Sequence, residues 1–214
     1  MRLETGSTGR AIPLGPSSAR TVRQSDEAAM ARVAIGDTSA FTVLVRRHSP
    51  ALYRVSVRML GDSHEAEDVV QECFVRLWQH APRWRPAGAG LFGWLHRAAM
   101  NLCFDRFRKF RVVTAEALPD PADNAPLADG LIEADEARLA IVRALNDLSE
   151  RYRAALVLCY YEGLSNAVAA EVLDLNVKAM ESLLHRARKQ LRALLEARQF
   201  TAHDLPCCYT ECAA

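Results

Sequence analysis

The segment from Leu164 to Arg188 constrains the fold of this chain most, because it reads as a short helix, a turn and a longer basic helix. Ser165 can cap the first helix, Asp174 tolerates the left-handed conformation of a tight turn, and Asn176 can cap the second helix. Apolar residues at helical spacing can pack the two helices together. The pattern predicts a helix-turn-helix, a motif whose second helix enters the major groove of DNA.

Charge is segregated along the chain in a way that the net charge hides. The 214 residues carry a formal net charge of +1, but Lys and Arg dominate Trp94 to Arg111 and the predicted last helix from Val177 onward. Between Glu116 and Glu136 the only charged residues are acidic. Two basic patches therefore flank an acidic segment, and basic surfaces favour contact with phosphates. For the helix pair of residues 164–188 alone, the alternative is an amphipathic helical hairpin whose basic residues are merely hydrated.

The composition, 50% hydrophobic and 25% charged, is ordinary for a soluble globular protein. No apolar run is long enough to span a bilayer, and the first 24 residues lack the apolar core of a signal peptide. We therefore expect a cytoplasmic protein without membrane insertion. In that reducing compartment the six cysteines should be free thiols or metal ligands rather than disulfides.

Helical patterns without strand-like alternation run through most of the chain, so we expect an all-α fold of two helical domains. Residues 1–24 are rich in Gly, Ser and Pro and are expected to form a flexible leader before a first domain of residues 25–111. The acidic, proline-containing segment 112–134 reads as a flexible linker. A second domain of residues 135–199 and a cysteine-containing tail of residues 200–214 follow.

Capping and helix-breaking residues predict the helix limits of the first domain. The predicted starts are Asp26, Asp37 or Thr38, Ser49 with Pro50, Asp62 with Ser63, and Leu91. The predicted ends are near Gly36, His48, Leu60, His80 and Arg111.

The helix predicted from His64 to Gln79 begins with acids and places an amide and Trp78 on its exposed faces. Such a surface suits docking onto a protein partner better than holding DNA. The alternative is a core helix with solvated acids and a buried Trp78.

The segment from Arg83 to Arg111 interleaves aromatic rings with cations. Rings can stack on unpaired bases while the cations meet phosphates. Trp94, Arg97 and Asn101 recur at three- and four-residue steps and can share one helix face, and the preceding loop could hold a base pulled from the stack. The alternative places the rings in the core and leaves the arginines hydrated.

In this order, these segments resemble the extracytoplasmic-function sigma factors, the smallest class of the sigma-70 family, which keep only the second and fourth sigma regions. The resemblance covers about residues 26–198. The stretches that carry it are residues 36–78 and 92–109 for the second region and residues 148–195 for the fourth.

The resemblance implies a promoter-specificity factor without catalytic residues, with core RNA polymerase and promoter DNA as partners, no required cofactor and the possibility of an anti-sigma factor. The core-polymerase contacts it implies are Asp68, Gln71, Glu72, Phe74 and Trp78. Those for the melted -10 element are Arg83, Trp84, Arg85, Trp94, Arg97 and Asn101. Those for the -35 element are Lys178, Glu181, Ser182, His185, Arg186, Arg188 and Lys189.

This chain departs from the family pattern in the helix-turn-helix, with Asp174 where glycine is usual and Glu181 where lysine is usual. The fold should tolerate both changes, but the -35 sequence becomes unpredictable. Glu181 could accept a hydrogen bond from a cytosine amino group or face solvent.

The tail lies beyond the usual end of the family. His203, Cys207, Cys208 and Cys212 could supply ligands for Zn(II) or Cu(I), and the resemblance extends to family members with metal-responsive cysteine-rich extensions. Their spacing is not the paired C-x-x-C of a strong zinc site, and the alternative is a terminus with incidental thiols. The remaining cysteines sit in apolar helical contexts and are expected to be small core residues.

Three other functional classes lead to different expectations. An enzyme is disfavoured because the sequence has no phosphate-binding glycine loop, nucleophile elbow or H-E-x-x-H motif. A helix-turn-helix transcriptional regulator should bind duplex DNA without polymerase. A metal-sensing adaptor should lose its function when the three tail cysteines are replaced.

Overall fold

The computed structural model describes residues 16–116 and 132–198, and these residues form helices with no strand among them. The first half contains α1 (Pro16–Val33), α2 (Thr38–Leu60), α3 (Ser63–His80), the 3-10 turn η1 (Ala81–Arg83) and α4 (Gly90–Glu116). The second half contains α5 (Ile132–Asn146), α6 (Glu150–Leu156), the π-helical η2 (Val157–Tyr161), α7 (Asn166–Val172) and α8 (Val177–Glu196). The predicted all-α fold of two helical domains is confirmed.

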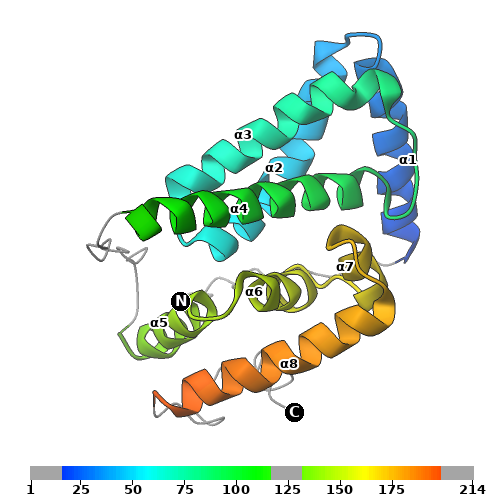
Figure 1. The fold of residues 1–214 in the computed structure, drawn as a ribbon. Coiled ribbons are helices and arrows are strands. Elements are labelled where there is room, and N and C mark those ends of the chain that lie inside the picture. Colours follow the sequence, from blue (N-terminus) through cyan, green and yellow to red (C-terminus); the bar gives the residue numbers. More distant parts are fainter. Residues whose placement is uncertain (1–15, 117–131, 199–214) are drawn as a thin grey trace, which may run out of the picture.

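The first half is a bundle in which α2 packs against α1, α3 and α4 (Figure 1). Its core residues recur at helical spacing, as Leu44, Leu52, Val55 and Met59 do on α2. In the second half α8 packs along α6, α7 and α5. Among the described residues no helix is both long and apolar enough to cross a membrane.

Several predicted caps are present. The Asp62 side chain accepts hydrogen bonds from the backbone N–H groups of His64 and Glu65, at 2.7 and 3.0 Å, and begins α3. Gly61 ends α2 in the left-handed conformation with φ of 73°. Asp37 begins α2 by accepting from the backbone of Ser39 and Ala40, and these bonds lower the pKa of its carboxyl, that from Ala40 most.

The start of the first helix differs from the prediction. Residues 16–24 were expected in the leader, but α1 begins at Pro16, whose missing N–H costs nothing at the first helical position. Asp26 does not cap this helix. It is buried within α1, where its carboxylate pairs with Arg47 and lies 3.1 Å from His48 Nε2. A partner from α2 thus decides its position rather than a local capping preference.

The predicted break at Ser49 and Pro50 is also wrong, because α2 continues through both residues. Ser49 Oγ donates to the Val45 carbonyl at 2.6 Å, as a serine inside a helix can. The buried face on either side, including Leu44 and Leu52, fixes both parts of the helix against the same core. Packing therefore outweighs the loss of one backbone hydrogen bond at proline. Similarly, α4 continues to Glu116, beyond the predicted end near Arg111.

The two halves pack against each other along α4 and α2. Helix α4 contacts α6 and α7, and α2 contacts α6 and η2. Arg153 of α6 lies at the centre of this interface, where it is buried and donates to the carbonyls of Met59 and Asn146. Its guanidinium carbon lies 5.3 Å from the centre of the Phe107 ring of α4. The interface therefore combines apolar packing with a buried guanidinium that two backbone carbonyls hold, although its Nε has no hydrogen-bond partner among the described residues.

Candidate functional site

An exposed stripe runs along α3, on the helix predicted to dock on a protein partner. Asp68, Gln71 and Trp78 all lie on it, with Trp78 37% exposed and its ring packed edge-on against Phe41 at 5.1 Å between centroids. The acidic start of the helix and the ring near its end are thus both accessible.

Two residues change the predicted composition of this stripe. Phe74 is only 6% exposed and packs edge-on against Phe41 of α2, so in this structure it lies in the core rather than on the stripe. Val75, which the sequence reasoning missed, is 54% exposed between Gln71 and Trp78. Its position, four residues after Gln71 and three before Trp78, was the available signal.

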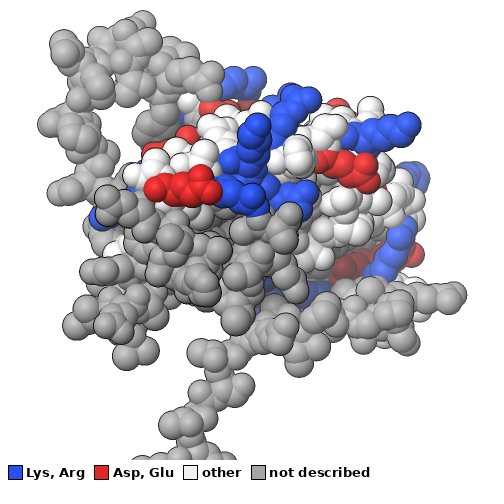
Figure 2. Space-filling view, turned by 90° about the horizontal axis from the view of Figure 1, so that it is seen from below, with Lys and Arg blue, Asp and Glu red and all other residues white. Residues whose placement is uncertain are grey.

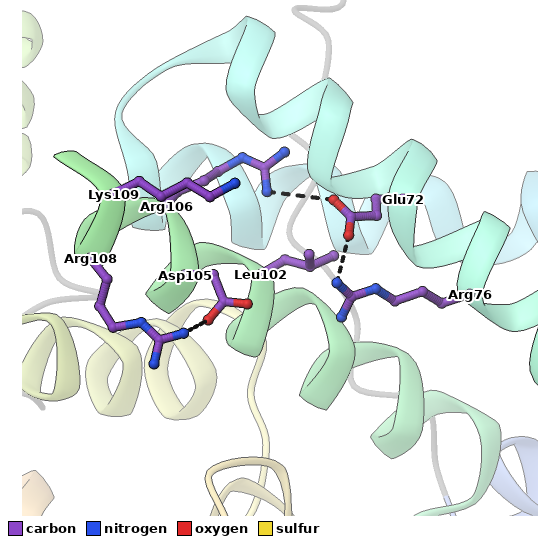
Figure 3. A pocket seen from close by; sticks show the side chains of 7 residues that line it. All are labelled: Glu72, Arg76, Leu102, Asp105, Arg106, Arg108 and Lys109. Carbon is purple, nitrogen blue, oxygen red and sulfur yellow. Dashed lines mark hydrogen bonds and ion pairs between the residues drawn. The ribbon is translucent and has the colours of Figure 1, made fainter. Parts of the chain in front are cut away.

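Glu72 lies beside the stripe in a pocket between α3 and α4 (Figure 3). Its carboxylate is 2.5 Å from Arg76 Nη2 and 3.9 Å from Arg106 Nη1. Arg106 also donates to Glu65 at 2.6 Å, and Asp105 pairs with Arg108 at the other side of the pocket. Glu72 is therefore half-buried and largely neutralised by two arginines, unlike the exposed Asp68.

The face of α4 predicted to meet an unpaired strand is partly accessible. Asn101 is exposed, whereas Trp94 is half-buried and stacks on His80 with centroids 5.5 Å apart and planes 10° apart. Arg97 Nη2 lies 2.9 Å from Asp174 Oδ1 in the turn of the helix-turn-helix. Sequence reasoning did not single out His80, although an aromatic residue just before the loop is the kind of group that can pair with a ring such as Trp94.

The loop before α4 presents Arg83 and Arg85 to solvent and keeps Trp84 half-buried against the core. The Ala89 N–H donates to both carboxylate oxygens of Glu171, at 2.9 and 3.0 Å. Gly88 has φ of 49°, and a Cβ there would lie 1.9 Å from Glu171 Oε1. The positive φ favours glycine here, and a side chain would also displace the flexible end of Glu171 from the loop.

The helix-turn-helix forms as its sequence predicts. The Ser165 and Asn176 side chains accept from the backbone of Val168 at 3.4 Å and Ala179 at 2.8 Å, and Asp174 adopts φ of 57°. A seam of buried residues joins α7 and α8, namely Ala169, Val172, Met180, Leu184 and Ala187.

Helix α8 brings most of the predicted -35 residues to its surface. Its exposed members are Lys178, Glu181, Ser182, His185, Arg186 and Lys189, whereas Arg188 is half-buried. They recur at steps of one, three and four, so they share one face opposite the buried seam. Figure 2, which views the molecule from the α8 side, shows Lys and Arg side chains gathered at the centre of this face with acids beside them.

The structure gives no role in metal binding to the residues it describes. No group of three His, Cys, Asp or Glu side chains that could hold a metal occurs within residues 16–116 and 132–198. His203, Cys207, Cys208 and Cys212 lie outside the described residues.

The other three cysteines are free, as expected, and Cys73 and Cys103 lie in the core while Cys159 is half-buried. Burial raises the pKa of the Cys73 and Cys103 thiols to about 12 and that of Cys159 to about 11. These cysteines therefore stay protonated at neutral pH and are poor nucleophiles.

His96 is a buried titratable group on α4. Its Nδ1 lies 2.8 Å from the Phe92 carbonyl, so the ring carries its proton on Nδ1. Burial lowers the pKa of His96 to about 4, which keeps the ring neutral at physiological pH.

Both halves of the chain match models of known protein families. Residues 44–111 match the family model for Sigma-70 region 2, and residues 138–191 match the model for Sigma-70 region 4. These segments include the α3 stripe, the α4 face and most of α8.

Two curated relatives are extracytoplasmic-function (ECF) RNA polymerase sigma factors. SigE of Mycolicibacterium smegmatis is 38% identical over 170 residues, which span 76% of this chain and 65% of that protein. The match thus falls just short of two thirds of SigE. SigW of Bacillus subtilis is 32% identical over 173 residues, which span 75% of this chain and 91% of SigW.

Two solved structures are also similar to this chain. CnrH, solved in complex with the cytosolic domain of CnrY, is 31% identical, with a TM-score of 0.59 over 81% of this chain and 98% of CnrH. The sigma factor RpoE of Bartonella quintana, solved with the anti-sigma factor NepR, shares the fold with a TM-score of 0.60 at 24% identity, over 73% of this chain and 96% of RpoE.

Proposed function

Because the chain belongs to the extracytoplasmic-function sigma factors of the sigma-70 family, we propose that three of its surfaces divide the work of promoter recognition. The exposed stripe of α3 docks on core RNA polymerase. The loop before α4 and the face of Trp94, Arg97 and Asn101 bind the melted strand of the -10 element. The exposed face of α8 reads the -35 element in duplex DNA.

The -35 assignment rests on the exposed face of α8, which carries both cationic and polar side chains. The helix is capped and follows directly after a tight turn. A helix held in this way can place its first turns in the major groove. Arg186 can form two hydrogen bonds with a guanine edge, whereas Lys178 and Lys189 can contact phosphates as point charges. Glu181 on the same face could accept from a cytosine amino group.

The docking assignment rests on the chemistry of the α3 stripe. A partly exposed tryptophan beside an exposed valine gives an apolar centre, and Asp68 and Gln71 give polar contacts around it. Interfaces are commonly anchored by such a ring within a polar surround. Val75 joins the proposed docking residues, and Phe74 supports them from the core through Phe41.

In this proposal the two working domains are residues 16–116 and 132–198, slightly longer than the sequence predicted, and they are joined by residues 117–131. The protein acts in the cytoplasm on core polymerase and catalyses no reaction itself. The proposal includes a second protein partner, because CnrH, at 31% identity, was solved in complex with the cytosolic domain of CnrY. The predicted anti-sigma factor would be such a partner.

The test is reconstitution of the full chain with core polymerase on a library of randomised promoters. We expect transcripts that start downstream of a shared pair of sequence elements and that require both proteins. Binding of specific duplex DNA without any polymerase-dependent transcription would instead identify a regulator and overturn the proposal.

Gating of activity by metal or redox chemistry at the tail stays a prediction. Run-off transcription with zinc, with copper and with chelator should differ for the natural chain and not for the variant with Cys207, Cys208 and Cys212 replaced by serine. Identical output from both chains under every condition would eliminate the idea.

A further inference from the structure

Helix α1 contacts the loop of residues 83–90, the -10 loop, through one side chain. Arg23 of α1 donates from Nη1 to the Gly88 carbonyl at 2.9 Å, although the two residues are 65 positions apart in the sequence. A Cβ at Gly90 would lie 3.7 and 3.8 Å from Cγ and Cδ of Arg23, so the aliphatic stem of the arginine passes over Gly90. One side chain of α1 thus touches both glycines that lead into α4.

These two glycines belong to a tight turn. The Gly90 N–H donates to the Ala87 carbonyl at 2.8 Å, and Gly88 and Gly90 both have positive φ, of 49° and 68°. Glycine loses more conformational freedom on ordering than any other residue, so a turn with two glycines needs contacts from outside to keep one shape. The hydrogen bond from Arg23 is such a contact, and it comes from the same half of the chain as the loop.

Two further sets of contacts fix the position of Arg23. Its Nε lies 3.2 Å from Glu27 Oε1, one helical turn further along α1. Asp26, three residues after Arg23, is only 3% exposed, pairs with Arg47 and lies 3.1 Å from His48 Nε2 of α2. A buried carboxylate with two partners on α2 fixes the rotation of α1 about its axis. The same rotation directs Arg23 towards the -10 loop, because residues three apart lie on neighbouring parts of one helix face.

The shape of the -10 loop matters for base capture. Extruding a base from the stack costs free energy, and a pocket that already has its bound shape does not have to be ordered at the same moment. Arg23 uses Nε for Glu27 and Nη1 for Gly88, so it holds the loop rather than reading a base.

We propose that Arg23 is a positioning residue of the -10 loop: it holds the Gly88 carbonyl and covers Gly90, and so keeps the turn in the shape that receives an unstacked base. The inference rests on the proposed function, because it takes residues 83–90 as part of the -10 surface. It adds α1 to the elements on which -10 recognition depends, although α1 lies before the residues 44–111 that match Sigma-70 region 2.

The first test measures the turn directly, in the free full chain without DNA. Arg23→Met removes the guanidinium and keeps an unbranched apolar stem. The Gly90 N–H, which closes the turn, should exchange with deuterium about fivefold faster in this variant, because one partly exposed charge-assisted hydrogen bond is lost. The matched control is Arg46→Met, which removes an exposed arginine of α2 and should leave the exchange rate of Gly90 unchanged. An unchanged rate in Arg23→Met would overturn the proposal.

The second test measures base capture in the holoenzyme, reconstituted from the full chain and core polymerase. A single-stranded -10 oligonucleotide of the selected promoter is compared with the same strand carrying an abasic site, placed where loss of the base most weakens binding by the natural chain. Arg23→Met should weaken binding of the intact strand about fivefold and leave binding of the abasic strand unchanged. Arg23→Lys should recover part of the loss, because its ammonium can still donate to a carbonyl.

Equal weakening of the intact and abasic strands by Arg23→Met would also overturn the proposal, because a lost positive charge acts on phosphates whether or not the base is present. Failure of the proposed function would look different: no promoter in the library would be transcribed, whereas the exchange rate of Gly90 would still increase in Arg23→Met. Thermal unfolding verifies that every variant is folded.

Discussion

Helices α4 and α8 both carry residues proposed to contact DNA, but they differ in how many of those residues already pair with other side chains. On α4, Trp94 stacks on His80 and Arg97 pairs with Asp174. On α8, none of Lys178, His185, Arg186 and Lys189 forms an ion pair with another described residue. The side chains of α8 proposed to read duplex DNA are thus already free to bind it. On α4, by contrast, Arg97 and Trp94 would first have to leave Asp174 and His80 before they could contact a melted strand.

The buried apolar seam between α7 and α8 holds α8 in position. Removing part of this seam should produce the largest of the predicted effects, a loss of stability. Met180 is fully buried between α7 and α8, so Met180→Ala should lower the free energy of unfolding by about 2–5 kcal/mol. Chemical denaturation followed by circular dichroism measures the change. Ser182→Ala on the exposed face is the matched control and should change it by less than about 0.5 kcal/mol. Equal losses in both variants would show that the seam does not support α8.

Lowering the pH should destabilise the half of the protein that contains α4, because His96 of that helix is buried. The folded-state pKa of about 4 lies below the ordinary value of 6.5, so the unfolded chain takes up a proton that the folded chain does not. Stability is therefore fully present above pH 6.5 and falls as the pH decreases towards 4, by about 3 kcal/mol for this group.

Denaturation series at pH 7 and pH 4.5 check this expectation, with His96→Leu as the comparison. The variant should lose part of the pH dependence, since leucine has no proton to gain. An unchanged pH dependence in the variant would mean that His96 is not the group that destabilises the α4 core in acid.

Two substitutions on α8 separate base reading from phosphate contact and have the smallest expected effects. Arg186→Ala should weaken binding to the selected -35 duplex by about 1–3 kcal/mol and relax the preference at one base position. Lys189→Ala should weaken all duplexes alike and lower the salt dependence of binding by roughly one charge. Competition binding over a salt series measures both. Loss of base preference in the lysine variant instead would reverse the assigned roles.

Local chemistry was enough to predict most helix limits and the helix-turn-helix. Asp62, Ser165 and Asn176 cap helices because each side chain bonds to a backbone N–H only two or three residues away. Asp174 adopts the turn conformation for an equally local reason. Such features need no knowledge of what packs against them.

Two positions that the sequence did not predict depend on partners distant in the sequence. Asp26 was expected to cap a helix but pairs with Arg47, and Phe74 packs on Phe41 of the preceding helix. The contact between Arg97 and Asp174 joins residues from the two halves, and no periodicity in either segment indicates it. Sequence patterns identify which residues share a helix face, but not which face another helix will cover.

Gly88 marks the point where the loop before α4 comes close to α7. A side chain at this position would push away the flexible end of Glu171 and would also adopt a left-handed backbone, with φ of 49°. The Ala89 N–H would then lose its acceptor, so a single mutation at Gly88 would loosen one contact between the two halves.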